Sequence, residues 1–176
     1  AEGDEIKLFL ADETIEKFSE VKIQKVKKTK LHIIYEDEHV LLINKPSGML
    51  SQKAKEQDES LVEYLIDYLL GSGKLTERGL RAFRPSVCNR LDRNTSGLVL
   101  AARNSYAAPL LAQGVEKLYY AIVEGELPLG PGVIDAPIGR QGDSIIGRCV
   151  TPEGKPSRTE YTILKAKNGL SLAACV

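Results

Sequence analysis

The chain has 176 residues with 43% hydrophobic residues, which is enough to build a hydrophobic core and fits one domain of moderate size. No apolar run approaches the roughly 20 residues that a helix needs to cross a membrane, and the acidic start at residues 1–5 has no signal-peptide pattern. The three cysteines (Cys88, Cys149 and Cys175) are far apart and the histidines number only two, so we expect free thiols, a reducing cytoplasm and no metal site.

The formal net charge is zero, which argues against a strongly basic nucleic-acid binder. Between residues 74 and 103, however, basic residues clearly outnumber the two acidic ones, Glu77 and Asp92. The basic residues are Lys74, Arg78, Arg81, Arg84, Arg90, Arg93 and Arg103. A charge run alone is usually a solvated face, but a local excess of arginine around residue 92 also suits an RNA-facing surface.

Residues 3–10 have the pattern of a short strand, and residues 11–30 that of a polar, lysine-rich linker. The next two apolar runs, Leu31–Tyr35 and Val40–Asn44, are joined by a polar tetrapeptide and predict a hairpin. The second run leads into the turn sequence Lys-Pro-Ser-Gly. Its lysine, Lys45, either contacts RNA or packs the turn, and the residues leave both roles open.

A capping box predicts that a helix begins at Ser60, because Glu63 follows three residues later. Apolar and tyrosine side chains then recur at helical spacing up to Gly71, which is a plausible helix end. Residues 71–85 predict a loop or a short helix. A further helix is expected at 104–114, although Pro109 argues against a regular one.

The central stretch of the chain is a charged loop that precedes a buried strand. The apolar run Gly97–Ala102 has the length and composition of such a strand, and residues with turn chemistry come before it. Asp92 lies in that loop between Arg90 and Arg93. In an extended loop Arg90 and Asp92 would point to the same face and Arg93 to the other, and a loop held by a rigid strand is a common place for chemistry.

The remainder of the chain predicts mostly strands. Lys117–Glu124 is apolar on both faces, which favours a central strand with Tyr120 facing the core. Residues 126–132 predict a loop. Further strands are expected at 144–150, 157–165 and 170–176. Strand follows strand with few helices between, so we predict an α+β fold with a mixed, mostly antiparallel sheet and flanking helices.

Three motifs in this order resemble a known family. The sequence Arg-Leu-Asp-Arg-Asn-Thr-Ser-Gly of Arg90–Gly97 resembles the signature loop of the RluA-type pseudouridine synthases. Asn44–Gly48 is similar to the upstream Lys-Pro-x-Gly turn, and Lys117–Gly125 to the downstream Lys-x-Tyr strand. The resemblance covers roughly residues 31–176. It implies the pseudouridine synthase fold and the isomerisation of uridine to pseudouridine in structured ribosomal or transfer RNA, without a cofactor.

The resemblance also assigns roles to individual residues. It implies that Asp92 is the catalytic carboxylate, that Arg90 has a base-flipping role at the substrate, and that Tyr119 is the substrate-binding tyrosine of the active site. Asn89 stands where the family usually has histidine, and we expect a structural role for it. Thr95 and Ser96 are expected to hydrogen-bond the loop backbone.

The resemblance also implies a domain organisation. Residues 1–10 would be the tail of an S4-like RNA-binding domain, 11–30 a linker, and 31–176 a partial catalytic domain. It would be partial because the family continues to a Gly-Arg-x-His-Gln-x-Arg motif, whose arginine pairs with the catalytic aspartate, and this chain stops before it.

Two other functions compete with this interpretation. A non-catalytic RNA-binding protein that retains the fold is favoured by Asn89 and by the absence of that C-terminal motif. An N-glycoside hydrolase breaks the same bond, but it normally needs paired carboxylates, and no second acid lies near Asp92 in the sequence.

Overall fold

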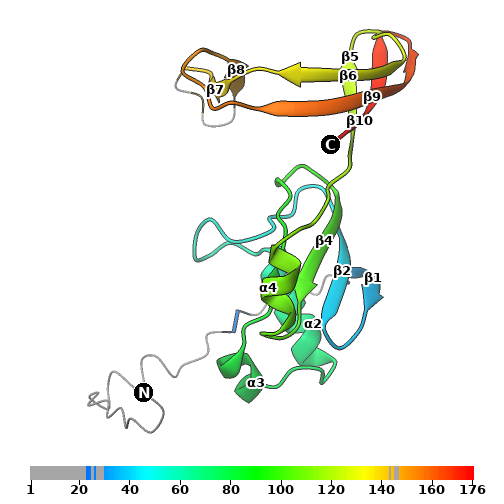
Figure 1. Cartoon of the computed structure of the whole chain (residues 1–176). Helices are drawn as coiled ribbons and strands as arrows, with labels where there is room; N and C mark the ends of the chain where they lie inside the picture. Colours follow the sequence, from blue (N-terminus) through cyan, green and yellow to red (C-terminus); the bar gives the residue numbers. More distant parts are fainter. Residues whose placement is uncertain (1–22, 25, 27–29, 143, 145–146) are drawn as a thin grey trace, which may run out of the picture. The chain divides into compact units, whose positions relative to one another are not determined.

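The structure is a computed structural model that describes residues 23–24, 26, 30–142, 144 and 147–176 (Figure 1). The chain forms two compact units that divide between Val115 and Glu116. The strand predicted at 3–10 lies outside the described residues, as does most of the linker predicted at 11–30. In the described part of the chain, no helix has the length and apolar character needed to span a membrane.

The first unit is built on a four-stranded antiparallel sheet in the order β1-β2-β4-β3. Its strands are β1 (His32–Glu36), β2 (Val40–Lys45), β3 (Ser86–Val87) and β4 (Gly97–Ala102), which confirms the predicted hairpin and the predicted buried strand. Lys45 pairs with Gly97 at one end of the sheet, which we call the loop end. At the other end, the hairpin end, Ala102 pairs with both Val40 and Ser86.

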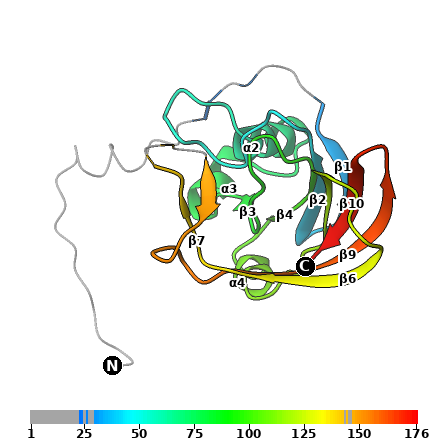
Figure 2. The ribbon, with the colours of Figure 1, turned by 90° about the horizontal axis from the view of Figure 1, so that it is seen from above.

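Helix α2 (Leu61–Gly71) packs beside β2 and β4 and completes the core of this unit (Figures 1 and 2). The predicted capping box is present, because the Glu63 carboxylate accepts hydrogen bonds from the Ser60 amide (3.2 Å) and hydroxyl (2.6 Å). The fully buried apolar side chains come from the helix and both strands: Leu41, Ile43, Leu61, Leu65 and Val99. Gly71 is the last helical residue, and the left-handed backbone that follows is at Gly73 (φ +70°).

Two short helices flank this core. Helix α3 (Glu77–Ala82) begins at Thr76, whose hydroxyl accepts a hydrogen bond from the Gly79 amide at 3.0 Å, and its buried residue is Leu80. Helix α4 (Ala107–Ala112) packs beside β4 through the buried Ala107 (Figure 1). Pro109 is tolerated there because it lies in the first turn, where backbone N–H groups have no partner within the helix.

A charged cluster at the hairpin end joins β1, α2 and the residue after β4. The Glu36 carboxylate accepts hydrogen bonds from the Tyr68 hydroxyl (2.8 Å) and the Lys74 ammonium (2.6 Å), and its other oxygen lies 3.3 Å from the Arg103 guanidinium. Burial alone would raise the pKa of Glu36, but the bonds from Lys74 and Tyr68 and the charges of Lys74 and Arg103 hold that pKa below its usual value.

The second unit contains a four-stranded sheet in the order β5-β10-β9-β6 and a two-stranded hairpin. The sheet consists of β5 (Tyr119–Glu124), β6 (Gly130–Asp135), β9 (Arg158–Lys167) and β10 (Leu170–Cys175), and the hairpin of β7 (Ile138–Arg140) and β8 (Arg148–Val150). Every strand pair is antiparallel. The two units together confirm the predicted α+β fold with mostly antiparallel pairing.

Strand β5 corrects two expectations. It lies at the edge of its sheet in the described chain, where β10 is its single neighbour, and not at the centre. Tyr120, which we expected in the core, is 65% exposed, and Ile122 on the same face is 73% exposed. Apolar residues on both faces therefore do not identify a central strand here.

We expect Glu36→Gln to lower the free energy of unfolding by about 1–3 kcal/mol at pH 7, because Tyr68, Lys74 and Arg103 lose the anion that they surround. The pKa of Glu36 is lowered in the folded state, so its stabilising contribution is complete above the unfolded pKa of about 4.3 and is lost as the pH falls through the folded value. Urea unfolding at pH 7 and pH 3 measures this, and the difference in stability between the two proteins should be smaller at pH 3 than at pH 7.

Glu38→Gln is the matched control, because its side chain is 84% exposed and its one ion-pair partner is His39. It should leave the stability at pH 7 unchanged. An equal loss in both variants would show that the Glu36 cluster does not hold this end of the sheet.

Candidate active site

The loop between β3 and β4, residues 88–96, is held against the turn that follows β2. We call these segments the signature loop and the anchoring turn (residues 46–51). The Gly48 amide donates to the Arg93 carbonyl at 2.7 Å, and Arg93 Nε donates back to the Gly48 carbonyl at 3.1 Å. The Ser47 hydroxyl donates to the Asn94 carbonyl at 2.9 Å. Two motifs that are far apart in the sequence therefore form one structural element.

Ser51 fixes the residue that precedes Asp92. Its hydroxyl donates to the Leu91 carbonyl at 2.7 Å and accepts from the Leu91 amide at 3.0 Å. The side chain is 4% exposed, so both hydrogen bonds are shielded from water. Ser47 and Ser51 therefore perform the role that we expected of Thr95 and Ser96, whose side chains make no such bond within the described structure.

Lys45 lies beneath the signature loop and is fully buried. Its ammonium group donates to the carbonyls of Pro46 (3.0 Å), Met49 (2.8 Å) and Arg93 (3.3 Å). Burial lowers the pKa of Lys45, and the negative charge of Asp92 opposes that change. This decides between its two possible roles in favour of packing the turn, since a fully buried ammonium cannot touch RNA.

Asn89 attaches the start of the loop to β4. Its amide nitrogen donates to the Leu98 carbonyl at 3.2 Å, and its amide oxygen accepts from the Leu100 amide at 2.7 Å. The side chain thus occupies the place of a neighbouring strand beyond the end of β3. The expected structural role of Asn89 agrees with this geometry.

Asp92 and Arg90 are exposed on this rigid loop. The main-chain carbonyl of Asp92 accepts from the Thr95 amide at 3.1 Å, which closes a turn behind the carboxylate. No ion pair joins Arg90 to Asp92 or to another acid among the residues described. Arg90 and Asp92 therefore do not neutralise each other by an ion pair, and the negative charge of Asp92 acts on the buried Lys45.

Tyr119 belongs to the second unit, whereas Arg90 and Asp92 belong to the first. It is the first residue of β5, where it pairs with Cys175 of β10, and its side chain is 38% exposed. The signature loop therefore brings Arg90 and Asp92 together on one element, and Tyr119 stands on another.

The basic residues of 74–103 do not all surround the signature loop. Lys74 and Arg103 pair with Glu36 at the hairpin end of the sheet. Of the seven, Arg90 and Arg93 alone lie in the loop itself. The expectation that the whole run forms one surface around Asp92 is therefore wrong. Residues that are close in sequence lie at opposite ends of the sheet here.

The chain matches the family model of the RNA pseudouridylate synthases over residues 39–176. It is 37% identical over 150 residues to the uncharacterized RNA pseudouridine synthase YjbO of Bacillus subtilis. This alignment covers 82% of this chain and 50% of that protein. It is 36% identical over 141 residues to the ribosomal large subunit pseudouridine synthase D of Pseudomonas aeruginosa, covering 77% of this chain and 42% of the relative. The chain thus spans about half the length of these relatives.

Solved structures show the same fold. Human RNA pseudouridylate synthase domain containing 1 superposes with a TM-score of 0.57 at 22% identity, over 86% of this chain and 61% of the other. The anchored loop and the fold define a protein of the pseudouridine synthase class. The chain belongs to the RNA pseudouridylate synthase family, and its named relatives confirm the resemblance to the RluA type.

We expect Lys45→Met to lower the free energy of unfolding by about 2–4 kcal/mol, because three carbonyls lose their buried donor. Lys55→Met, at an exposed position, is the matched control and should change stability by less than about 0.5 kcal/mol. Chemical denaturation of both variants measures this. If Lys45→Met is as mild as the control, the ammonium does not hold the two segments together.

Ser51→Ala should loosen the loop at Leu91, since the amide and carbonyl of that residue lose their partner together. Hydrogen exchange at the Leu91 amide should become at least about tenfold faster, while exchange in β4 stays as it was. Ser47→Ala is the control, because the Ser47 hydroxyl bonds only the Asn94 carbonyl. Unchanged exchange at Leu91 would contradict the anchoring role of Ser51.

Proposed function

We propose that this chain acts as an RNA pseudouridine synthase that isomerises a uridine in structured RNA, with Asp92 as the catalytic carboxylate. The observation that supports this most directly is the presentation of Asp92. Its side chain is exposed, while the residues on both sides are fixed, Leu91 by Ser51 and Arg93 by Gly48 and Lys45. A carboxylate held in this way is ready to meet a substrate with little loss of conformational freedom.

The reaction needs an anionic group beside the ribose and a site for one extruded base. The bond from C1′ to N1 of uracil breaks, the base turns, and a bond from C1′ to C5 forms while the C5 hydrogen leaves as a proton and N1 gains one. No electrons are exchanged with another molecule, so the isomerisation requires no redox partner. Asp92 would act either as the nucleophile at C1′ or as the base that removes a ribose proton.

Arg90 and Tyr119 are the proposed substrate-binding residues. Arg90 is exposed and has no acidic partner within the described chain, so its guanidinium is available for a phosphate or for the space left by an extruded base. Tyr119 carries a partly exposed ring, which suits stacking on uracil and donating a hydrogen bond from the phenol.

Ribosomal RNA is the substrate that we propose to test first, because several relatives are named as ribosomal large subunit pseudouridine synthases. Transfer RNA is the second candidate from the motif resemblance. Both substrates are consistent with the cytoplasmic location that we propose from the free thiols.

Asp92→Asn should reduce the rate of isomerisation by at least about a hundredfold, since the amide has no charge to attack or to accept a proton. Tritium released from C5 of tritiated-uridine RNA reports the reaction. Binding of the same RNA should stay nearly unchanged. Asp67→Asn is the control, because Asp67 is exposed on α2 and should retain the full rate.

Retained turnover by Asp92→Asn would refute the assignment of the catalytic carboxylate. If the full-length protein binds RNA and releases no tritium, the function is that of an RNA-binding protein with this fold. The two outcomes are distinguished by the parent protein, which releases tritium in the first case and releases none in the second.

A further inference from the structure

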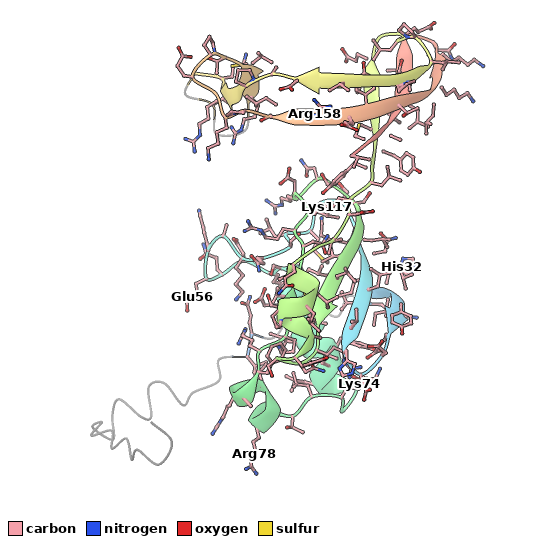
Figure 3. The ribbon with its side chains drawn as sticks, in the orientation of Figure 1. His32, Glu56, Lys74, Arg78, Lys117 and Arg158 are labelled. Carbon is pink, nitrogen blue, oxygen red and sulfur yellow. The ribbon has the colours of Figure 1, made fainter. Side chains whose placement is uncertain are left out.

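Three arginines on and after α3 form a second basic surface, separate from the signature loop. We call it the α3 basic surface, and it consists of Arg78, Arg81 and Arg84, all of which are exposed. Arg78 and Arg81 are three residues apart and so lie on one side of the helix. Figure 3 shows Arg78 projecting from α3 away from the body of the first unit.

The charges of this surface are not neutralised by neighbouring acids. Lys74 and Arg103 both pair with Glu36, but no ion pair reaches Arg78, Arg81 or Arg84 from the residues that the structure describes. The sequence offers one nearby acid, Glu77, and it lies in the first turn of α3, where it favours the helix dipole. A net positive field therefore faces outward from α3.

The fold does not depend on these arginines. Helix α3 is attached by the buried Leu80 and capped by Thr76, and among the described residues no hydrogen bond involves the side chains of these three arginines. Their removal should therefore leave the first unit folded. This separates them from Arg93, whose side chain holds the anchoring turn.

The α3 basic surface lies at the hairpin end of the sheet. The segment that contains α3 is fixed on one side by Lys74, which bonds Glu36 at the end of β1, and on the other by Ser86, which pairs with Ala102. Asp92 lies at the opposite end, beyond Gly97. Since β4 has six residues, the two sites are separated by about 20 Å along the first unit.

We propose that the α3 basic surface binds phosphates of the RNA substrate at a distance from the target uridine. This inference rests on the proposed function and adds a second RNA contact to it. Double-stranded DNA carries about one phosphate charge per 1.7 Å of helix axis. By analogy, a structured RNA that reaches about 20 Å from the target uridine offers many phosphates. A short single strand held only at the signature loop would not reach α3.

The residue type favours phosphate as the ligand. All three side chains are arginine, whose planar guanidinium can bond two phosphate oxygens at once and keeps its charge at every physiological pH. An acidic peptide is the competing ligand, because carboxylates suit the same geometry. RNA is favoured because the family acts on RNA and the surface belongs to the same compact unit as the signature loop.

The test measures binding of two RNA probes by the whole chain and by the triple variant Arg78→Gln, Arg81→Gln, Arg84→Gln. For a synthetic stem-loop of about 30 nucleotides, the variant should bind at least about tenfold more weakly in 0.1 M salt. Its slope of log affinity against log salt should be smaller by about 2–3, as the loss of three phosphate contacts implies. For a trinucleotide that contains uridine, which is too short to reach α3 from the signature loop, both proteins should bind equally.

Two matched variants separate location from charge. Lys155→Gln, Lys165→Gln, Lys167→Gln removes the same net charge from exposed positions of the second unit and should leave stem-loop binding within about threefold of the parent. Arg78→Lys, Arg81→Lys, Arg84→Lys keeps the positive charge and should retain most of the salt dependence. Thermal unfolding of each variant checks that the first unit is intact.

An unchanged stem-loop affinity and salt slope in the glutamine variant would overturn the inference. The inference would also be overturned if the variant Lys155→Gln, Lys165→Gln, Lys167→Gln lost as much stem-loop affinity, because net charge alone would then explain the loss. If polyglutamate binds the parent more tightly than the stem-loop, the surface is a site for acidic protein. Asp92→Asn should leave the salt slope unchanged, so a failure of the catalytic assignment is read from tritium release and not from this experiment.

Discussion

The buried ammonium of Lys45 is the interaction on which the candidate site depends. A charge with no exposure to water is costly unless hydrogen bonds compensate for it, and Lys45 achieves this with three main-chain carbonyls, one of them on the signature loop. The anchoring turn can bend around that ammonium because Gly48 adopts φ +87°, and the loop can enter β4 because Gly97 adopts φ +135°. The buried cation thus joins the anchoring turn to the signature loop.

The two ends of the first sheet differ in how their charged side chains are arranged. At the hairpin end, Glu36 gathers Tyr68, Lys74 and Arg103 into a compensated cluster. At the loop end, the side chains of Arg90 and Asp92 carry opposite charges without pairing. A fold whose core and ion cluster lie elsewhere can keep such groups free, because their mutual attraction is not needed to hold the chain together.

Local signals in the sequence predicted local structure correctly. The hairpin at 32–45, the capping box at Ser60 and the strand at 97–102 each depend on residues that are close in sequence, so their patterns are sufficient. Contacts across 40 residues were missed, since nothing near Ser51 indicates that it bonds Leu91. The edge position of β5 was missed for a related reason, because side-chain pattern reports the faces of a strand and not its neighbours.

Asn89 shows how a departure from a family motif can be interpreted through structure. Its amide supplies one donor and one acceptor to successive positions of β4, at Leu98 and Leu100. An imidazole in that place would change its hydrogen-bonding pattern near neutral pH, whereas an amide does not titrate. The attachment of the signature loop to β4 is therefore independent of protonation at residue 89. In the proposed reaction, proton transfer would then rest with the carboxylate of Asp92, while Asn89 fixes the position of the loop.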